Sequence, residues 1–246
     1  KGVSTEEVAP DSVTKSGVSL YKKIFSNLSE SYDRFAQIIK DTGRSLGKVT
    51  SVWYGPVAYE YSGQVHPDAT MPDEFKAIAR MIEKQLGLTE GYFNSALVNI
   101  FPKGSKLGKH ADDENIFART DQTIGKVATI TLGGNADVSI IPKDGKTDVE
   151  TLPTEDGDLY VMPGQLFQRR YKHLVKNIKG ERISFTFRHI PDNRIPNEEQ
   201  LKGDFQDIAA GRLPRAAEKV AWAQRVKDKL KKDFPRIAGV EVDSII

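Results

Sequence analysis

Two of the four histidines in this chain have neighbours that could bind a metal with them. His110 precedes Asp112 by two residues, and residues two apart on an extended strand project from the same face. His173 begins a second segment of strand-like sequence. Two imidazoles and one carboxylate are the facial ligand set of non-haem Fe(II) sites, and they leave three coordination positions for other ligands. The alternative is that both are ordinary surface or core histidines, because His-x-Asp often occurs by chance.

The segment 182–188 is a second candidate for binding chemistry. Arg182 and Arg188 share one side of the expected strand with Ser184 and Thr186, while the residues between them are apolar. A guanidinium enclosed in a barrel requires a carboxylate, and Arg binds carboxylates through two parallel hydrogen bonds. A dicarboxylic acid could therefore occupy this face. The alternative is a half-exposed edge strand whose arginines are solvated.

Composition narrows the class of protein. The 246 residues are 38% apolar and 28% charged, which is typical of a soluble globular protein. The absence of cysteine excludes disulfides, thiolate zinc sites and cysteine nucleophiles. The net charge of +2 gives no overall reason to expect a nucleic-acid partner. Charge-free stretches are too short to span a bilayer and no secretory leader is evident, so we expect a cytoplasmic monomer without a membrane partner. The start at Lys1 suggests a segment excised from a longer polyprotein.

The pattern of apolar residues predicts an α+β protein. Three-to-four spacing predicts helices at about 19–43 and 72–87. The chain beyond them is rich in short strands punctuated by turn residues, which indicates a sandwich or barrel with the helices packed outside. These strands are expected near 95–101, 127–132, 137–141, 158–162, 173–177 and 182–188.

The two ends of the chain differ from this central part. Residues 1–18 are small and polar and predict a flexible arm. Residues 192–246 predict a helical, basic extension, with a helix over about 215–234. Its lysines and arginines could follow phosphates, or they could form a solvated helix face.

Five short motifs occur in an order that can be compared with known protein families. They are Asn99-Ile100-Phe101, Gly104 to Glu114 with His110-Ala111-Asp112, Gly157 to Met162, Tyr171-Lys172-His173, and Arg182 to Arg188. Upstream lie the aromatic segments Val52-Trp53-Tyr54-Gly55 and Tyr59-Glu60-Tyr61-Ser62-Gly63. Over about residues 49–191, this arrangement resembles the AlkB family of Fe(II)/2-oxoglutarate dioxygenases.

The resemblance implies a fold and a set of cofactors. The fold is a double-stranded β-helix, or jelly roll, with flanking helices, spanning about residues 19–191 and including a nucleotide-recognition lid at about 49–63. The cofactors are Fe(II), 2-oxoglutarate and O2. The resemblance assigns the iron to His110, Asp112 and His173.

It also implies residues that bind 2-oxoglutarate. The first arginine of the final motif, Arg182 here, pairs with the distal carboxylate, and the last, Arg188, lies near the carboxylate beside the keto group. Asn99 contacts the co-substrate as well. Phe101 occupies a position where the family has tyrosine, so a hydroxyl contact is lost, and Ser184 occupies a position where many members have asparagine.

The activity implied is oxidative demethylation of N-alkylated bases such as 1-methyladenine and 3-methylcytosine in RNA or DNA. The products are formaldehyde, succinate and CO2. A base acted upon must leave its stack, so flat side chains must hold it. We expect His110 to form one wall of the pocket, Trp53, Tyr59 or Tyr61 to form the other, and Glu114 to reach an exocyclic amine. Plain strand packing is the alternative for each aromatic residue.

Two other functions remain open at this point. The scaffold serves several substrate classes, so a 2-oxoglutarate oxygenase that acts on a protein or a small molecule is one alternative. A non-catalytic nucleic-acid-binding relative is the other. The aromatic segment favours nucleic acid over the first, and the intact triad argues against the second.

Overall fold

The computed structural model describes residues 8–61, 64–117, 125–145 and 149–195. The chain divides into two compact units. The first comprises residues 1–54 and 71–194, and the second comprises 55–70 and 195–246. Each unit is described by itself.

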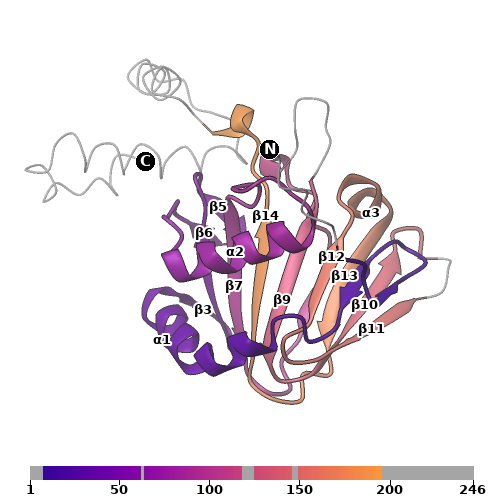
Figure 1. Ribbon diagram of the computed structural model, residues 1–246, viewed down its shortest axis with the longest axis horizontal. Coiled ribbons are helices and arrows are strands. Elements are labelled where there is room, and N and C mark those ends of the chain that lie inside the picture. Colours follow the sequence, from indigo (N-terminus) through magenta and orange to yellow (C-terminus); the bar gives the residue numbers. More distant parts are fainter. Residues whose placement is uncertain (1–7, 62–63, 118–124, 146–148, 196–246) are drawn as a thin grey trace, which may run out of the picture. The chain divides into compact units, whose positions relative to one another are not determined.

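The first unit is built around an eight-stranded sheet in which every neighbouring pair is antiparallel (Figure 1). The strand order is β1 (Ser12–Val13), β2 (Ser19–Tyr21), β12 (Leu159–Met162), β9 (Val127–Gly133), β14 (Arg182–Arg188), β7 (Ser95–Phe101), β4 (Val49–Tyr54) and β3 (Arg44–Leu46). Neighbours in this sheet are mostly distant in sequence, as a jelly roll requires.

A second, four-stranded antiparallel sheet completes the β structure of this unit. Its order is β11 (Glu150–Thr154), β10 (Ala136–Pro142), β13 (Tyr171–Lys176) and β8 (Leu107–His110). The α+β jelly-roll fold expected from the sequence is therefore confirmed, and all six predicted strands form. The short strands β8 and β11 were not predicted, because glycine and proline interrupt their apolar pattern.

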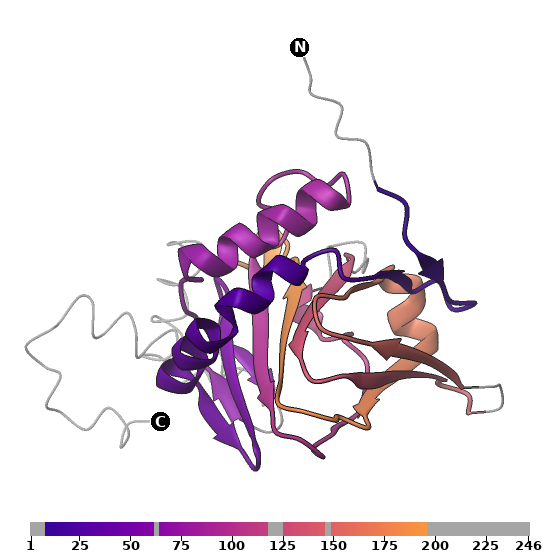
Figure 2. The same cartoon turned by 60° about the horizontal axis from the view of Figure 1, so that its bottom comes forward.

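Two helices cover one face of the large sheet (Figures 1 and 2). They are α1 (Tyr32–Thr42), which follows a 3-10 turn at Ser26–Ser31, and α2 (Asp73–Gln85). Phe35 of α1 and Phe75 of α2 contact Phe185 of β14 edge-to-face, with ring centroids 5.6 and 5.0 Å away. The apolar residues of β14 thus face the helices, and the alternation of the strand turns its arginines to the opposite face.

That opposite face lies in the core between the two sheets. The core cluster joins Phe101, Val127 and Tyr160 of the large sheet to Val138 and Val175 of the small sheet. The polar residues of β14 therefore point into a largely apolar interior, where each needs a partner.

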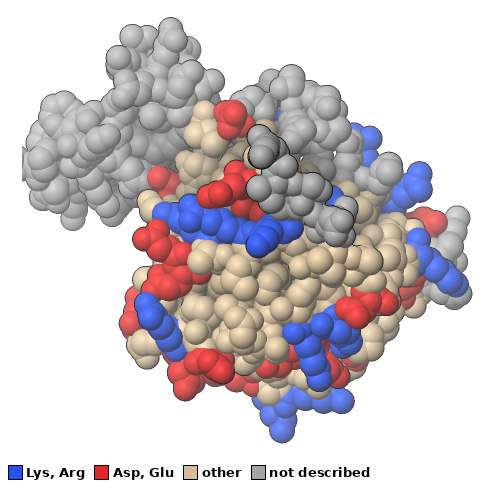
Figure 3. All heavy atoms as spheres, viewed as in Figure 1, with Lys and Arg blue, Asp and Glu red and all other residues tan. Residues whose placement is uncertain are grey.

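The outer surface over the helices is electrically mixed. Figure 3 shows acidic and basic side chains interspersed on the face that α1 and α2 cover. Exposed ion pairs such as Arg34–Glu74, Lys40–Glu181 and Arg80–Glu90 account for part of this mixing. A face without an excess of one charge does not attract a phosphate backbone electrostatically.

Of the two predicted terminal segments, the structure describes part of the first. The described part of the predicted arm, residues 8–18, is paired: β1 bonds β2, and Asp11 accepts a hydrogen bond from the Lys22 N–H at 2.7 Å. The polar sequence of residues 8–18 does not predict this pairing, because the hydrogen bonds join backbone groups at the edge of the sheet. Residues 196–246, which include the predicted basic helix, lie outside the described residues; a 3-10 turn at Asp192–Arg194 precedes them.

The predicted lid at 49–63 is also corrected. Residues 49–54 form β4, an interior strand of the large sheet that pairs with β3 and β7. In the second unit, β5 (Tyr59–Tyr61) pairs instead with β6 (Gln64–His66), and Gly55 bridges Ala69. The error arose because a strand rich in valine and aromatic residues has the same composition in a lid and in a sheet. In the described part of the chain, no helix has the length and apolar character needed to span a membrane.

Candidate metal centre

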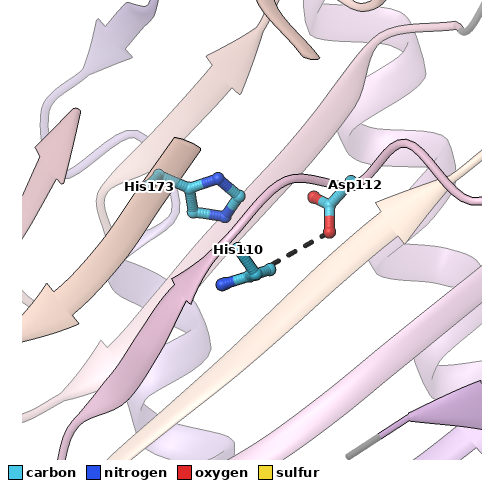
Figure 4. A group of neighbouring side chains, drawn as sticks. All are labelled: His110, Asp112 and His173. Atoms are coloured by element: carbon cyan, nitrogen blue, oxygen red, sulfur yellow. Dashed lines mark ion pairs between the residues drawn. The ribbon is translucent and has the colours of Figure 1, made fainter. Parts of the chain in front are cut away.

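The three predicted metal ligands come together (Figure 4). His110 ends β8, Asp112 lies two residues further along, and His173 is the direct cross-strand partner of His110 on β13. One donor atom from each lies within 4.8 Å of those of the other two. This cluster has the chemistry and the spacing to hold a divalent metal through two nitrogens and one oxygen.

His110 is held in the tautomer that a metal requires. Its Nδ1 lies 2.8 Å from the carbonyl oxygen of Gly108. Because a carbonyl can only accept, Nδ1 carries the proton and Nε2 keeps its lone pair. Nε2 lies 3.9 Å from Oδ1 of Asp112, so both ligand atoms point toward one position (Figure 4).

Asp112 is buried, at 1% exposure, and is fixed from two sides. Arg188 Nη2 donates to Oδ1 at 2.7 Å, and the backbone N–H of Asp112 donates to Gln168 Oε1 at 2.9 Å. Burial opposes ionisation, but the Arg188 guanidinium outweighs it and holds the pKa of this carboxyl well below its usual range. Asp112 is therefore a carboxylate whenever the protein is folded near neutral pH.

His173 is buried and neutral. Burial, together with His110 and Arg188, lowers the pKa of its imidazole to about 3 against the opposing effect of Asp112. Its Nδ1 and the Asp112 Oδ2 atom are both buried and find no hydrogen-bond partner among the described residues. Leaving such atoms unsatisfied is costly, and a divalent cation would satisfy the carboxylate. The residues present thus fit a bound metal.

Arg182 is a buried cation with neutral partners only. At 1% exposure it donates from Nη1 to the Gly134 carbonyl at 3.1 Å and from Nη2 to Thr154 Oγ1 at 3.0 Å. Gly134 must lack a side chain, because a Cβ there would lie 2.4 Å from the Gly180 carbonyl oxygen. Burial lowers the pKa of Arg182 to about 10, so it stays charged at neutral pH. Within the described ranges, no carboxylate lies at ion-pair distance from it, which leaves a site for an anion.

The other predicted co-substrate residues lie on the same face of the sheet. Asn99 on β7 is directly opposite Ser184 on β14, and both are buried. Asn99 Oδ1 accepts a hydrogen bond from Ser51 of β4. Arg188, which was expected near the keto end of the co-substrate, donates to the metal ligand Asp112.

The predicted base-pocket residues differ in their local surroundings. Trp53 is 2% exposed and packs edge-to-face on Phe117, with ring centroids 6.3 Å apart. The Arg188 guanidinium lies over the Phe117 ring, 5.3 Å from its centroid. Trp53 is thus covered by another ring. Glu114 is half-buried just beyond Asp112. Tyr59 is buried in the second unit, and the side chain of Tyr61 lies outside the described residues.

Sequence reasoning missed three residues at this centre. Gln168 lies on the short helix α3 (Gln165–Arg170), Phe117 ends a 3-10 turn at Asn115–Phe117, and Tyr160 is on β12. Phe117 could have been suspected as an aromatic residue five positions after a metal ligand. Tyr160 lies within the Gly157 to Met162 motif, but the motif alone did not assign a role to its side chain. Gln168 gave no such signal, since only the tertiary fold brings it to the centre.

Comparisons with known proteins agree with this geometry. The family model of the 2OG-Fe(II) oxygenase superfamily matches residues 20–188. In the solved structure titled "The structure of OsALKBH1", the whole chain superposes on 72% of this one, with a TM-score of 0.57 and 17% identity, so the two share a fold.

Curated relatives are plant-virus proteins. The RNA replication protein of Grapevine virus A (isolate Is 151) is 30% identical over 146 residues, which are 59% of this chain and 8% of that protein. The RNA replication protein of Papaya mosaic potexvirus is 33% identical over 130 residues, or 53% of this chain and 8% of that protein. This chain therefore spans less than a tenth of the length of either relative. With the matching family model, the shared fold and the ligand cluster, the chain belongs to the 2OG-Fe(II) oxygenase superfamily as an AlkB-like member, and its cofactors are Fe(II), 2-oxoglutarate and O2.

Proposed function

We propose that this domain removes methyl groups oxidatively from N-alkylated bases, of the 1-methyladenine and 3-methylcytosine type, in RNA. The observation that carries the proposal is the combination of the His110–Asp112–His173 cluster, which strands of the small sheet position, with a buried Arg182 on β14 of the large sheet that has only neutral hydrogen-bond partners among the described residues. The names of the curated relatives, RNA replication proteins, favour RNA over DNA.

The metal ligands act by geometry and charge. Asp112 brings the single negative charge, which Arg188 keeps ionised, and the two histidines bring imidazole nitrogens. Gly108 and Gln168 fix the orientation of His110 and Asp112, respectively. Bound Fe(II) supplies the oxidative chemistry with O2 and 2-oxoglutarate.

The co-substrate is held by residues of the inner sheet face. Arg182 pairs with the distal carboxylate, because a buried guanidinium with only neutral partners gains most from an anion. Asn99 and Ser184, side by side on β7 and β14, contribute neutral hydrogen bonds next to it. A buried site excludes bulk water from the reaction.

The methylated base enters beside His110. The side chain of His110 is 27% exposed, whereas Asp112 and His173 are buried, so the cluster is most open on the His110 side. The imidazole ring then forms one wall for a flipped base. Glu114, two residues beyond Asp112, is our candidate for contact with the exocyclic amine.

The test is incubation of the chain with Fe(II), 2-oxoglutarate and matched RNA and DNA oligomers that carry one 1-methyladenine or 3-methylcytosine. Mass spectrometry of the oligomers and assay of succinate report the two halves of the reaction, with Asp112→Ala as the inactive control. We expect demethylation of RNA ahead of DNA. Succinate without loss of any methyl group would point to a protein or small-molecule substrate, and neither product from the folded wild type would refute the proposal.

A further inference from the structure

A tight turn at residues 14–17 of the arm is fixed to one end of the large sheet. The turn closes on itself, because the N–H of Gly17 donates to the Thr14 carbonyl at 2.9 Å and the N–H of Val18 donates to Thr14 Oγ1 at 2.9 Å. Strand β2 follows directly and pairs with β12. Val18 and Leu20 are buried in the core between the two sheets. The turn therefore cannot shift without disturbing the edge of the large sheet.

Glu150 of the small sheet binds this turn with both of its carboxylate oxygens. The N–H of Lys15 donates to Oε1 at 2.7 Å, and the N–H of Ser16 donates to Oε2 at 3.0 Å. Ser16 and Glu150 are 134 residues apart in sequence. Hydrogen bonds to an ionised carboxylate are stronger than those between neutral groups. We call this contact between Glu150 and residues 14–17 the latch.

The latch joins the β1–β2 end of the large sheet to the free edge of the small sheet. Glu150 begins β11, the first strand in the order of the small sheet, and β11 pairs there with β10. An edge strand is bonded along one side only, so it opens more easily than an interior strand. A second attachment at Glu150 therefore restricts the strand that is least restrained by the sheet itself.

The other end of β11 contacts the arginine assigned to the co-substrate. Thr154 is 1% exposed, accepts from Arg182 Nη2 at 3.0 Å and donates to the Ala136 carbonyl at 2.9 Å. Thr154 and Glu150 are four residues apart on β11, so the period of the strand places both on the inner face. Of the two neutral acceptors that hold Arg182, Thr154 is the one that β11 supplies. A shift of β11 would thus change the direction of the guanidinium.

We propose that Glu150 is a positioning residue for 2-oxoglutarate. By binding the turn at 14–17 it holds β11, and so Thr154, where Arg182 points at the distal carboxylate. Recognition of a carboxylate by two parallel hydrogen bonds depends on that direction. The inference rests on the role of Arg182 in the proposed function, but it is independent of the nucleic-acid substrate. The metal ligands should not respond, because β10 lies between β11 and the strands that carry His173 and His110.

The test measures binding by calorimetry under Mn(II), without oligonucleotide. Glu150→Gln keeps the shape of the side chain but turns an NH2 group toward one of the two N–H donors. It should raise the Kd for 2-oxoglutarate about three- to tenfold, the range expected when a residue acts through its neighbours. The Kd for Mn(II) alone, and for pyruvate, which lacks the distal carboxylate, should stay unchanged.

Asp11→Asn is the matched control. Asp11 is also a carboxylate of the arm that accepts a backbone N–H, from Lys22 at 2.7 Å, but this bond ties the arm to the end of β2 and not to the small sheet. The control should bind 2-oxoglutarate as the wild type does. Hydrogen exchange should become faster over residues 149–155 in Glu150→Gln and stay unchanged there in Asp11→Asn, which separates the latch from a general loosening of the arm.

The same contact can be broken from the arm. Lys15→Pro removes one of the two N–H donors at an exposed position, so it carries the test if Glu150→Gln fails to fold. The effects of the two substitutions on the Kd for 2-oxoglutarate should not add, because both break one contact. An affinity equal to that of Asp11→Asn in either folded variant would overturn the inference, as would an equal loss for pyruvate.

Arg182→Met, measured alongside, distinguishes failure of this inference from failure of the proposed role of Arg182. Loss of 2-oxoglutarate binding in Arg182→Met with none in Glu150→Gln would overturn the latch and leave the role of Arg182 intact. Unchanged binding in Arg182→Met would overturn both.

Discussion

The Gln168 side chain accepts a hydrogen bond from the backbone N–H of Asp112 at 2.9 Å, and it is fully buried. Gln168 belongs to α3, which leads directly into the strand that carries His173. One amide therefore joins the loop of one metal ligand to the segment of another. Such outer contacts orient ligands and raise the affinity of a metal site.

We expect Gln168→Met to weaken Mn(II) binding about ten- to a hundredfold, the usual effect of losing an outer-sphere partner of a metal ligand. Methionine has a similar shape but offers no strong acceptor to the Asp112 N–H. Calorimetric titration measures the Kd, and thermal unfolding confirms that the variant is folded. Gln37→Met is the matched control, because Gln37 is exposed on α1 and donates a hydrogen bond to Asp41, one turn along the same helix. Equal affinities in the two variants would contradict the assignment.

The ion pair between Asp112 and Arg188 links metal binding to stability. We expect Asp112→Ala to abolish Mn(II) binding and to lower the free energy of unfolding by about 3–5 kcal/mol, because the buried Arg188 loses its carboxylate. The double variant Asp112→Ala/Arg188→Met should recover much of that stability but no metal binding. Urea unfolding measures the first effect and calorimetry the second. A single variant as stable as wild type would show that the pair contributes little.

The parts of this site that were predictable from sequence are those with a local pattern. Strict alternation over β14 indicates which side of the strand carries Arg182, and a two-residue spacing indicates that His110 and Asp112 share a face. Tyr160 lies in an apolar run whose sequence is the same whether its side chain packs in the core or faces a site. The assignment of β4 to a lid failed for a related reason: the partners of a strand are set by distant segments, β3 and β7, and not by its own residues.

Alkaline pH should weaken the fold through Tyr32. Burial, with Glu181 beside it, raises the pKa of this phenol above its ordinary value of 10.0, and its hydroxyl donates to Glu181 at 3.1 Å. Since the folded pKa is above the unfolded one, this stabilisation is fully present below about pH 10 and is lost as pH rises toward the folded value. We expect the free energy of unfolding of Tyr32→Phe to fall less steeply with pH above pH 10 than that of the wild type. Unfolding by urea at a series of pH values tests this, and parallel curves for both proteins would contradict it.

The aromatic residues expected at the base pocket should separate into structural and binding roles. Trp53 is buried against Phe117, so Trp53→Ala should lower the free energy of unfolding by about 3–5 kcal/mol through a core cavity. Tyr61→Ala should instead weaken binding of methylated RNA roughly ten- to a hundredfold, which is the loss of affinity expected when one base loses its stacking partner. Succinate formed without RNA should be unchanged in Tyr61→Ala, because the metal and Arg182 sites are untouched. Urea unfolding, RNA titration and succinate assay distinguish these effects. If Tyr61→Ala bound methylated RNA as tightly as wild type, the hairpin of β5 and β6 would have no part in holding the base, and recognition would have to rest on His110 and Glu114.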